Sequence, residues 1–159
     1  KMRVKAIQDE NFQDYKLPSM FISTCFCDGK CWRELGLEKS NCQNEQIMQE
    51  ETLDISDSYI VTRYLHNPIT SAVVIGGLEP MLQFDEVVNF IKELRKYRDD
   101  PVVIYTGYYP EEIADKLPIL AAQHNIIVKF GRYIPNKPSK FDEILGINLV
   151  SDNQYAQKL

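Results

Sequence analysis

Short runs of apolar residues recur along the chain, and each one leads into a glycine or a polar residue. The runs occupy residues 20–23, 72–75, 101–105, 126–130 and 147–150. Continuous apolar runs of this length are typical of strands that are buried on both faces, as in parallel sheets. The pattern therefore predicts five strands.

Between the strands, the spacing of apolar residues becomes helical. Residues 54–66 and 85–97 repeat apolar side chains three or four positions apart, and Ser56 or Asp57 is expected to cap the first of these helices. A proline followed by two glutamates at residues 110–112 predicts a third helix, which ends near Gln123. Strands that alternate with helices predict an α/β fold with a mostly parallel sheet.

The carboxyl ends of parallel strands meet at one edge of a sheet, where ligands bind in α/β proteins. The candidate site is therefore built from Cys27, Gly76 with Gly77, Thr106 with Gly107, Gly131, and residues 151–153. Residues 28–50 are polar and predict a long loop, which is typical of a functional or disordered segment. No element is assigned to residues 3–16, and residues 1–159 are expected to form a single domain.

Charge and composition exclude some classes of function. The net charge of −5 argues against broad binding to a nucleic-acid backbone, and no apolar stretch reaches the roughly 20 residues that span a bilayer. Residues 1–5 lack the apolar segment of a signal peptide, so we expect no export signal and a cytoplasmic protein. The acidic surface favours either solubility or docking on a basic partner.

The four cysteines all fall between Cys25 and Cys42. Without an export signal they are expected to be reduced, and clustered thiols then indicate metal or redox chemistry. Only Cys27 and Cys31 form a pair with the spacing of a zinc knuckle, while iron–sulfur clusters accept more varied spacing. The cysteines alone leave both zinc and an iron–sulfur cluster open.

The cysteines together with the strand-end motifs resemble the radical S-adenosylmethionine superfamily. The motifs are Gly76-Gly77-Leu78-Glu79-Pro80 after the second strand and Tyr105-Thr106-Gly107-Tyr108 after the third, with echoes at residues 128–133 and 150–154. Within the superfamily the chain most resembles the activating proteins of anaerobic ribonucleotide reductases, and the resemblance covers about residues 19–159.

Three details differ from the usual family pattern. Ten residues separate Cys31 from Cys42, eight more than in the family's C-x₃-C-x₂-C motif. The residue before the third cysteine is Asn41 where the family commonly has an aromatic ring, which Trp32 could supply. Leu78 interrupts the Gly-Gly-Glu-Pro motif.

The resemblance implies a partial (β/α) barrel whose loop at about residues 25–44 binds one [4Fe–4S] cluster through Cys27, Cys31 and Cys42. The iron without a cysteine ligand would bind S-adenosylmethionine, and one electron would cleave that molecule to methionine and a 5′-deoxyadenosyl radical. The implied partners are the large subunit of an anaerobic (class III) ribonucleotide reductase, which receives a glycyl radical, and an electron donor such as flavodoxin or ferredoxin. Cys25 is expected to pack at the strand end, with replacement of Cys27 as the alternative.

The resemblance also assigns the S-adenosylmethionine site. Gly76 and Gly77 would bring the backbone close to the methionine amino group, and Glu79 would accept a hydrogen bond from it. From the residues alone, the glycine pair could instead serve only a tight turn.

Five further residues are candidates for contacts with S-adenosylmethionine. Tyr105 and Thr106 would contact its ribose or carboxylate, with core and cap positions as the alternative. Lys129 interrupts an apolar strand, so its ammonium is expected either in the cleft beside an anionic group or at the sheet edge. Asn153 and Gln154 would contact adenine or cap the last strand.

Two other functions stay open on the sequence. One is a minimal radical enzyme that acts on another protein, a peptide or a small molecule. The other is a non-catalytic interaction domain stabilised by zinc or by a cluster.

Overall fold

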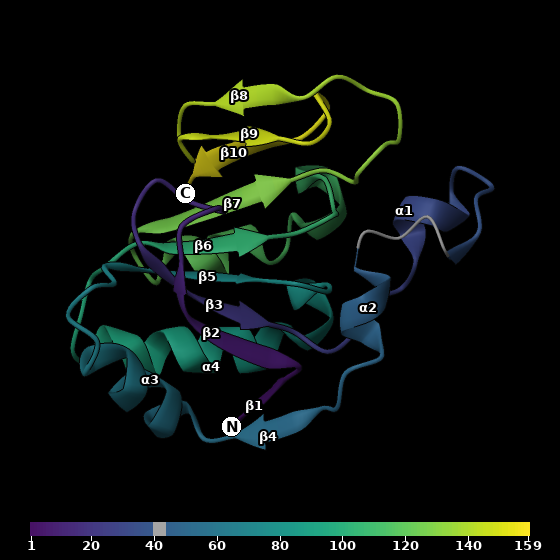
Figure 1. Cartoon of the computed structure of the whole chain (residues 1–159). Coiled ribbons are helices and arrows are strands. Elements are labelled where there is room, and N and C mark those ends of the chain that lie inside the picture. Colours follow the sequence, from purple (N-terminus) through teal and green to yellow (C-terminus); the bar gives the residue numbers. More distant parts are fainter. Residues whose placement is uncertain (40–43) are drawn as a thin grey trace.

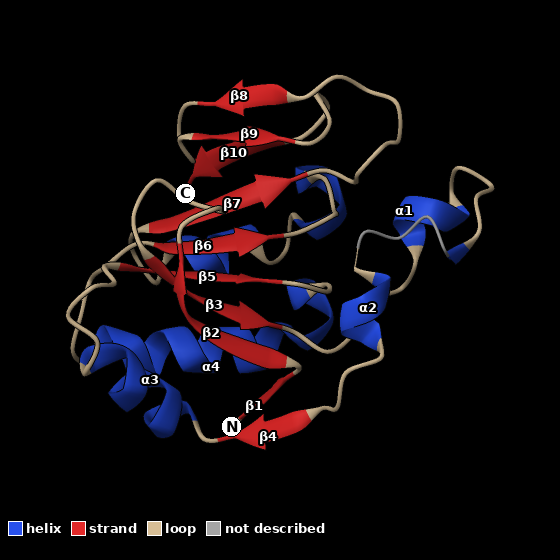
Figure 2. Cartoon of the chain, viewed as in Figure 1, coloured by secondary structure: helices blue, strands red, loops and turns tan. Residues whose placement is uncertain are grey.

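Four parallel strands form the centre of one sheet in this computed structural model, which describes residues 1–39 and 44–159. They are β3 (Ser19–Ser23), β5 (Ala72–Gly76), β6 (Val102–Tyr105) and β7 (Ile126–Phe130). Two antiparallel edge strands, β2 (Ala6–Asn11) and β10 (Tyr155–Lys158), complete the order β10-β7-β6-β5-β3-β2 (Figures 1 and 2). The predicted α/β fold class, with a mostly parallel sheet as in a partial (β/α) barrel, is confirmed.

Two helices, α3 (Asp57–Leu65) and α4 (Phe84–Arg95), follow the sequence pattern and lie on one side of the sheet (Figure 1). α3 begins where predicted, because the Ser56 hydroxyl accepts a hydrogen bond from the Tyr59 N–H at 3.2 Å. α4 buries one apolar face against the sheet. Within the described residues, no helix has the length and apolar character to span a bilayer.

The two faces of the sheet pack against different partners. On one face, alternate strand residues such as Ile75 and Ile104 pack with the helices. On the other face, Val74 and Val103 pack against Tyr15 and the turn that joins β8 (Lys140–Asp142) to β9 (Ile147–Leu149). The second face is therefore covered by chain segments without helices.

The helix predicted from Pro110 to about Gln123 is interrupted. The structure has a 3₁₀ turn, η3 (Pro110–Ile113), followed by a separate short helix, α5 (Leu117–Ala121). Pro118 is the physical reason, because proline lacks an N–H and is tolerated only in the first turn of a helix. A new helix therefore has to begin beside it.

The prediction that residues 147–150 form the last strand of the main sheet is wrong. β9 pairs with β8 in a separate two-stranded sheet, and β10 occupies the sheet position instead. β10 reads Tyr-Ala-Gln-Lys, and only its alanine is buried, so it carries no apolar run. An edge strand needs little apolar sequence because one side of it faces solvent.

Short elements also form outside the predicted strands and helices, and residues 54 and 55 of the helix predicted over 54–66 belong to a strand instead. β1 (Met2–Val4) pairs with β4 (Leu53–Ile55) near the N-terminus. The described part of the predicted loop at residues 28–50 includes the single-turn helices α1 (Lys30–Arg33) and α2 (Glu45–Met48). η2 (Pro80–Gln83) leads into α4.

The close approach of Gly77 to β3 gives a test of this packing. Gly77 has a φ of 79°, and a Cβ there would lie 2.8 Å from the Ser23 Cβ. We expect Gly77→Ala to lower the free energy of unfolding by about 2–4 kcal/mol, from backbone strain and overpacking together.

Gly36 provides the matched control, since its φ is 67° and a Cβ there would have no atom of the described residues within 4 Å. Gly36→Ala should cost only the strain, about 1–2 kcal/mol. Urea unfolding followed by circular dichroism measures both losses, and equal losses would contradict the contact with Ser23.

Candidate functional site

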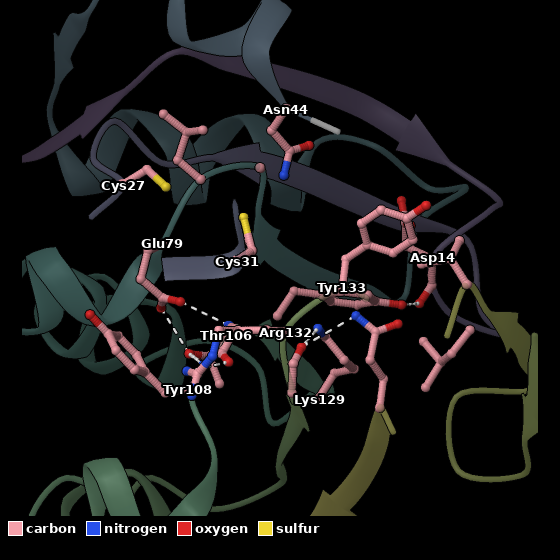
Figure 3. A pocket seen from close by; sticks show the side chains of 18 of the residues that line it. Asp14, Cys27, Cys31, Asn44, Glu79, Thr106, Tyr108, Lys129, Arg132 and Tyr133 are labelled. Atoms are coloured by element: carbon pink, nitrogen blue, oxygen red, sulfur yellow. Dashed lines mark hydrogen bonds between the residues drawn. The ribbon is translucent and has the colours of Figure 1, made fainter. Parts of the chain in front are cut away.

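A pocket of about 400 Å³ lies at the carboxyl ends of the parallel strands, beside α1 and α2 (Figure 3). Its volume falls in the range of about 300–1,000 Å³ that is typical of small-molecule sites. The strand-end residues that the sequence pointed to around this edge are largely its lining: Cys27, Gly77, Glu79, Tyr105, Thr106, Gly107, Lys129, Gly131 and Gln154.

Two of the cysteines in the described part of the chain face this pocket. Cys27 follows β3 and Cys31 lies in α1, and Figure 3 shows both sulfurs on the same side of the pocket as Asn44. Gly29 turns the chain between them with a φ of 73°, and its N–H donates to the Cys27 Sγ at 3.3 Å. Two half-buried thiols on one wall are a suitable donor set for a thiolate-bound metal or cluster.

The third predicted ligand, Cys42, lies outside the described residues. Within residues 1–39 and 44–159, no three His, Cys, Asp or Glu side chains lie close enough together to hold a metal ion. The described part of the site therefore supplies the thiols of Cys27 and Cys31.

Cys25 has a different environment from the other two described cysteines. It is buried and is not part of the pocket lining, and its backbone N–H donates to the Gln83 Oε1 at 2.8 Å. Burial raises the pKa of its thiol, although a hydrogen bond with the Thr52 side chain opposes this. Because metal ligation requires the thiolate, this environment favours the predicted packing role.

Glu79 joins the ends of β5 and β6 from a buried position. Its Oε2 accepts from the Met81 N–H at 3.0 Å and from the Thr106 hydroxyl at 2.8 Å, and its Oε1 accepts from the Gly107 N–H at 2.8 Å. Burial raises the pKa of Glu79, while these three donors and the Lys129 charge oppose the rise. Leu78 in the motif therefore does not remove Glu79 from the pocket.

The two glycines of the pair have different surroundings, because Gly76 packs against a neighbouring strand and Gly77 lines the pocket. Gly76 does not line the pocket, and a Cβ there would lie 3.1 Å from the Tyr105 Cβ. Its carbonyl accepts from both the Thr24 N–H at 2.8 Å and the Thr24 hydroxyl at 3.0 Å. Gly77 lies in the lining itself, so only this glycine of the pair brings backbone to the pocket.

Tyr105 and Lys129 lie side by side on the face of the sheet opposite the helices. The Lys129 Nζ lies 5.5 Å from the centre of the Tyr105 ring and donates to the Gly131 carbonyl at 2.9 Å. The Tyr105 hydroxyl donates to the Asp14 carbonyl at 2.5 Å. The structure thus places the Lys129 ammonium in the pocket, since β7 lies inside the sheet and not at its edge.

Burial lowers the pKa of Lys129 to about 8, although the Glu79 carboxylate nearby acts to raise it. An ammonium has three N–H donors, and the bond to the Gly131 carbonyl occupies one of them. Lys129 is therefore suited to an anionic ligand group.

Asn153 and Gln154 reach this end of the sheet at the start of β10, which runs antiparallel to β7. Gln154 lines the pocket, and its Nε2 donates to the Gly131 carbonyl at 3.3 Å. Asn153 lies behind the lining and donates to the Tyr109 hydroxyl at 2.9 Å and the Arg132 carbonyl at 2.7 Å. The Asn153 Oδ1 is buried and has no hydrogen-bond partner among the described residues, so it is an open acceptor there.

Sequence reasoning missed several charged side chains around the pocket. Arg132 donates to the Glu112 Oε1 at 2.8 Å, and the Tyr108 hydroxyl bonds to Asp28 between the two cysteines. Although burial acts to raise it, hydrogen bonds from Arg132, the Tyr109 N–H and Lys30 hold the pKa of Glu112 at about 2. In the sequence, Glu112 cannot be told from an ordinary acidic residue in the first turn of a helix. Arg132 directly follows a glycine at a strand end, and that position was the one sequence feature that could have placed it near the pocket.

The depressed pKa of Lys129 predicts a pH-dependent stability. Between about pH 8 and its ordinary value of 10.5, the unfolded chain binds this proton and the folded chain does not. The free energy of unfolding should therefore rise with pH in this window, by at most roughly 1.4 kcal/mol per pH unit from this group.

Lys129→Met isolates the contribution, because other groups titrate in the same window in both proteins. Urea unfolding at about pH 7.5 and about pH 10 should show a larger rise for the unchanged chain than for the variant. Equal rises would mean that Lys129 titrates normally.

Comparison with known proteins identifies the family. A family model described as a 4Fe-4S single cluster domain matches residues 20–154, from β3 to the residue before β10. Comparisons with curated proteins and with solved structures each found no match. Because the family match spans most of the chain and includes both pocket-facing cysteines, the chain belongs to the family of 4Fe-4S single cluster domains.

Proposed function

We propose that this chain is a radical S-adenosylmethionine activating enzyme that installs a glycyl radical on an anaerobic ribonucleotide reductase. The observation that carries the proposal is one pocket in which two thiols of a 4Fe-4S domain share the lining with Glu79 and Lys129. An anionic and a cationic group side by side match the two charges of an amino acid. The resemblance of the strand-end motifs to reductase-activating proteins supports the target.

The donor set fits a cluster with one iron free of cysteine. Cys27, Cys31 and Cys42 are the proposed ligands, and the two that lie in the described part of the chain face the pocket. A bound, reduced cluster would supply the one electron that cleaves a carbon–sulfur bond of S-adenosylmethionine, with methionine and a 5′-deoxyadenosyl radical as products. In the proposed reaction a partner glycine would give up a hydrogen atom to that radical, so the products would be 5′-deoxyadenosine and a glycyl radical.

Two charged residues of the pocket can form further hydrogen bonds, which would bind the methionine part of S-adenosylmethionine. The Glu79 Oε1 accepts one hydrogen bond from the Gly107 N–H, which leaves it room to accept another from the ligand ammonium. The Lys129 ammonium donates one hydrogen bond to the Gly131 carbonyl. Its remaining N–H donors would bind the carboxylate of the ligand. Gly77 allows the ligand to approach the backbone closely.

The rest of the ligand would contact residues from three other segments. Tyr105 and Thr106 serve the ribose or carboxylate, although the hydroxyl of each already donates within the chain. Gln154, which lines the pocket, is suited to the adenine amino group, and Asn153 supports this end of the sheet from behind through the hydrogen bonds that it donates. Enclosure by these groups limits water around the reactive radical.

The pocket continues beyond the proposed S-adenosylmethionine site. Its lining includes all three residues of β9 and Val150, whose side chain is 48% exposed. This open end could admit a glycine-bearing loop of a protein partner. A flavodoxin or a ferredoxin is the proposed electron donor.

The ligand assignment predicts different outcomes for two cysteine variants. After anaerobic reconstitution with iron and sulfide, Cys25→Ala should keep the cluster, because its thiol lies away from the pocket. Cys42→Ala should lose it, because only two ligands would remain. Iron and sulfide analysis with electron paramagnetic resonance of the reduced protein measures both, and the reverse pattern would overturn the assignment.

Activation itself is tested with the reductase. The reconstituted chain, S-adenosylmethionine, a reductant and an anaerobic ribonucleotide reductase should give 5′-deoxyadenosine and a glycyl radical signal. 5′-Deoxyadenosine without a glycyl radical would assign the chain to another substrate. Zinc in place of iron, or no cleavage of S-adenosylmethionine, would remove the catalytic proposal.

A further inference from the structure

The short helix that carries Cys31 has little to hold it in place by itself. α1 is four residues long and none of its residues is buried. One isolated helical turn is not stable in water, because nucleation is costly and few hydrogen bonds offset it. The position of Cys31 therefore depends on contacts that reach α1 from elsewhere.

Among the described residues these contacts include an ionic clamp formed by Lys30, Glu34, Glu112 and Arg132. The Lys30 Nζ also lies 5.1 Å from the centre of the Tyr108 ring. The Lys30 Nζ donates to the Glu112 Oε2 at 3.2 Å, on the residue before Cys31. The Arg132 Nε lies 2.8 Å from the Glu34 Oε2, at the residue that follows α1. The clamp thus contacts residues at both ends of α1.

Arg132 is itself fixed from several sides. Its Nη1 donates to the Glu112 Oε1 at 2.8 Å and to the Gly107 carbonyl at 3.1 Å, and its guanidinium lies 4.9 Å from the centre of the Tyr109 ring. The side chain is only 13% exposed. A planar guanidinium held by a fork of hydrogen bonds has little freedom to move, so it gives α1 a rigid anchor.

Glu112 connects the two basic side chains of the clamp. One of its oxygens accepts from Arg132 and from the Tyr109 N–H at 2.9 Å, and the other accepts from Lys30. The backbone contact fixes the carboxylate to the start of η3. Glu112 therefore connects the loops at the strand ends to α1 through its hydrogen bonds.

From these contacts we infer that Glu112 and Arg132 are positioning residues, which orient the Cys31 thiol toward the pocket by holding α1 across it. The functional meaning of this orientation rests on the proposed cluster site. The contacts themselves are a property of the chain with or without a cluster.

The expected effect is local. Ion pairs near the surface contribute little to global stability, typically about 0.2–1 kcal/mol, and the clamp stabilises a short helix that has no fully buried residue. Loss of the clamp should therefore loosen α1 while the sheet stays as it is.

Glu112→Gln tests the inference, with Glu111→Gln as the matched control on the exposed neighbouring glutamate. Hydrogen exchange of the chain without cluster should be roughly three- to tenfold faster at residues 31–35 in Glu112→Gln, and unchanged in Glu111→Gln. Exchange in β5 and β6 should not change in either variant. Glu112→Asp, which keeps the charge on a shorter side chain, should give an intermediate rate.

The reconstituted proteins provide the second readout. Glu112→Gln should broaden or shift the electron paramagnetic resonance of the reduced cluster, and Glu111→Gln should match the unchanged chain. If Glu112→Gln matches Glu111→Gln in both exchange and resonance, the inference is wrong. If the unchanged chain binds no cluster, the proposed function fails, while the exchange result still decides whether the clamp orders α1.

Discussion

The buried carboxylate of Glu79 is the contact on which the arrangement of the pocket depends. Removal of a carboxylate from water costs several kcal/mol, and three hydrogen bonds to a charged acceptor, each contributing about 1.5–3 kcal/mol, offset part of that cost, so the pKa of Glu79 stays raised. The donors come from η2 and from the loop after β6. The backbone N–H of Glu79 also donates to the Phe26 carbonyl at 2.7 Å, so the same residue fixes the start of the cysteine loop.

The difference between the two faces of the sheet explains why a pocket forms there at all. The helical face is filled by large apolar side chains, and α4 crosses it. On the opposite face the neighbouring side chains of Tyr105 and Lys129, which line the pocket, end in polar groups. The strands therefore pack into the core along most of their length, and the pocket forms at their carboxyl ends.

Burial decides which parts of the fold and of the site the sequence could predict. The central strands are covered on both faces and α4 on one face, so the residues that face the core must be apolar and their spacing is visible in the sequence. Glu79, Thr106 and Lys129 follow or interrupt these apolar runs, and that position marks them as unusual. The sequence did not predict β2 and β10, because an edge strand pairs through its backbone and needs no apolar pattern of side chains. Arg132 and Glu112 meet across 20 residues of sequence through a contact that only the fold creates.

The pocket-facing cysteines are attached to the fold in two different ways. Cys27 follows a segment fixed by backbone hydrogen bonds, from the Cys25 N–H to Gln83 and from the Glu79 N–H to the Phe26 carbonyl. Cys31 lies on a turn held through long charged side chains, whose contacts are screened by salt and cost side-chain entropy. The base of the cysteine loop is therefore its rigid part, and the clamp determines how far that rigidity extends along the loop.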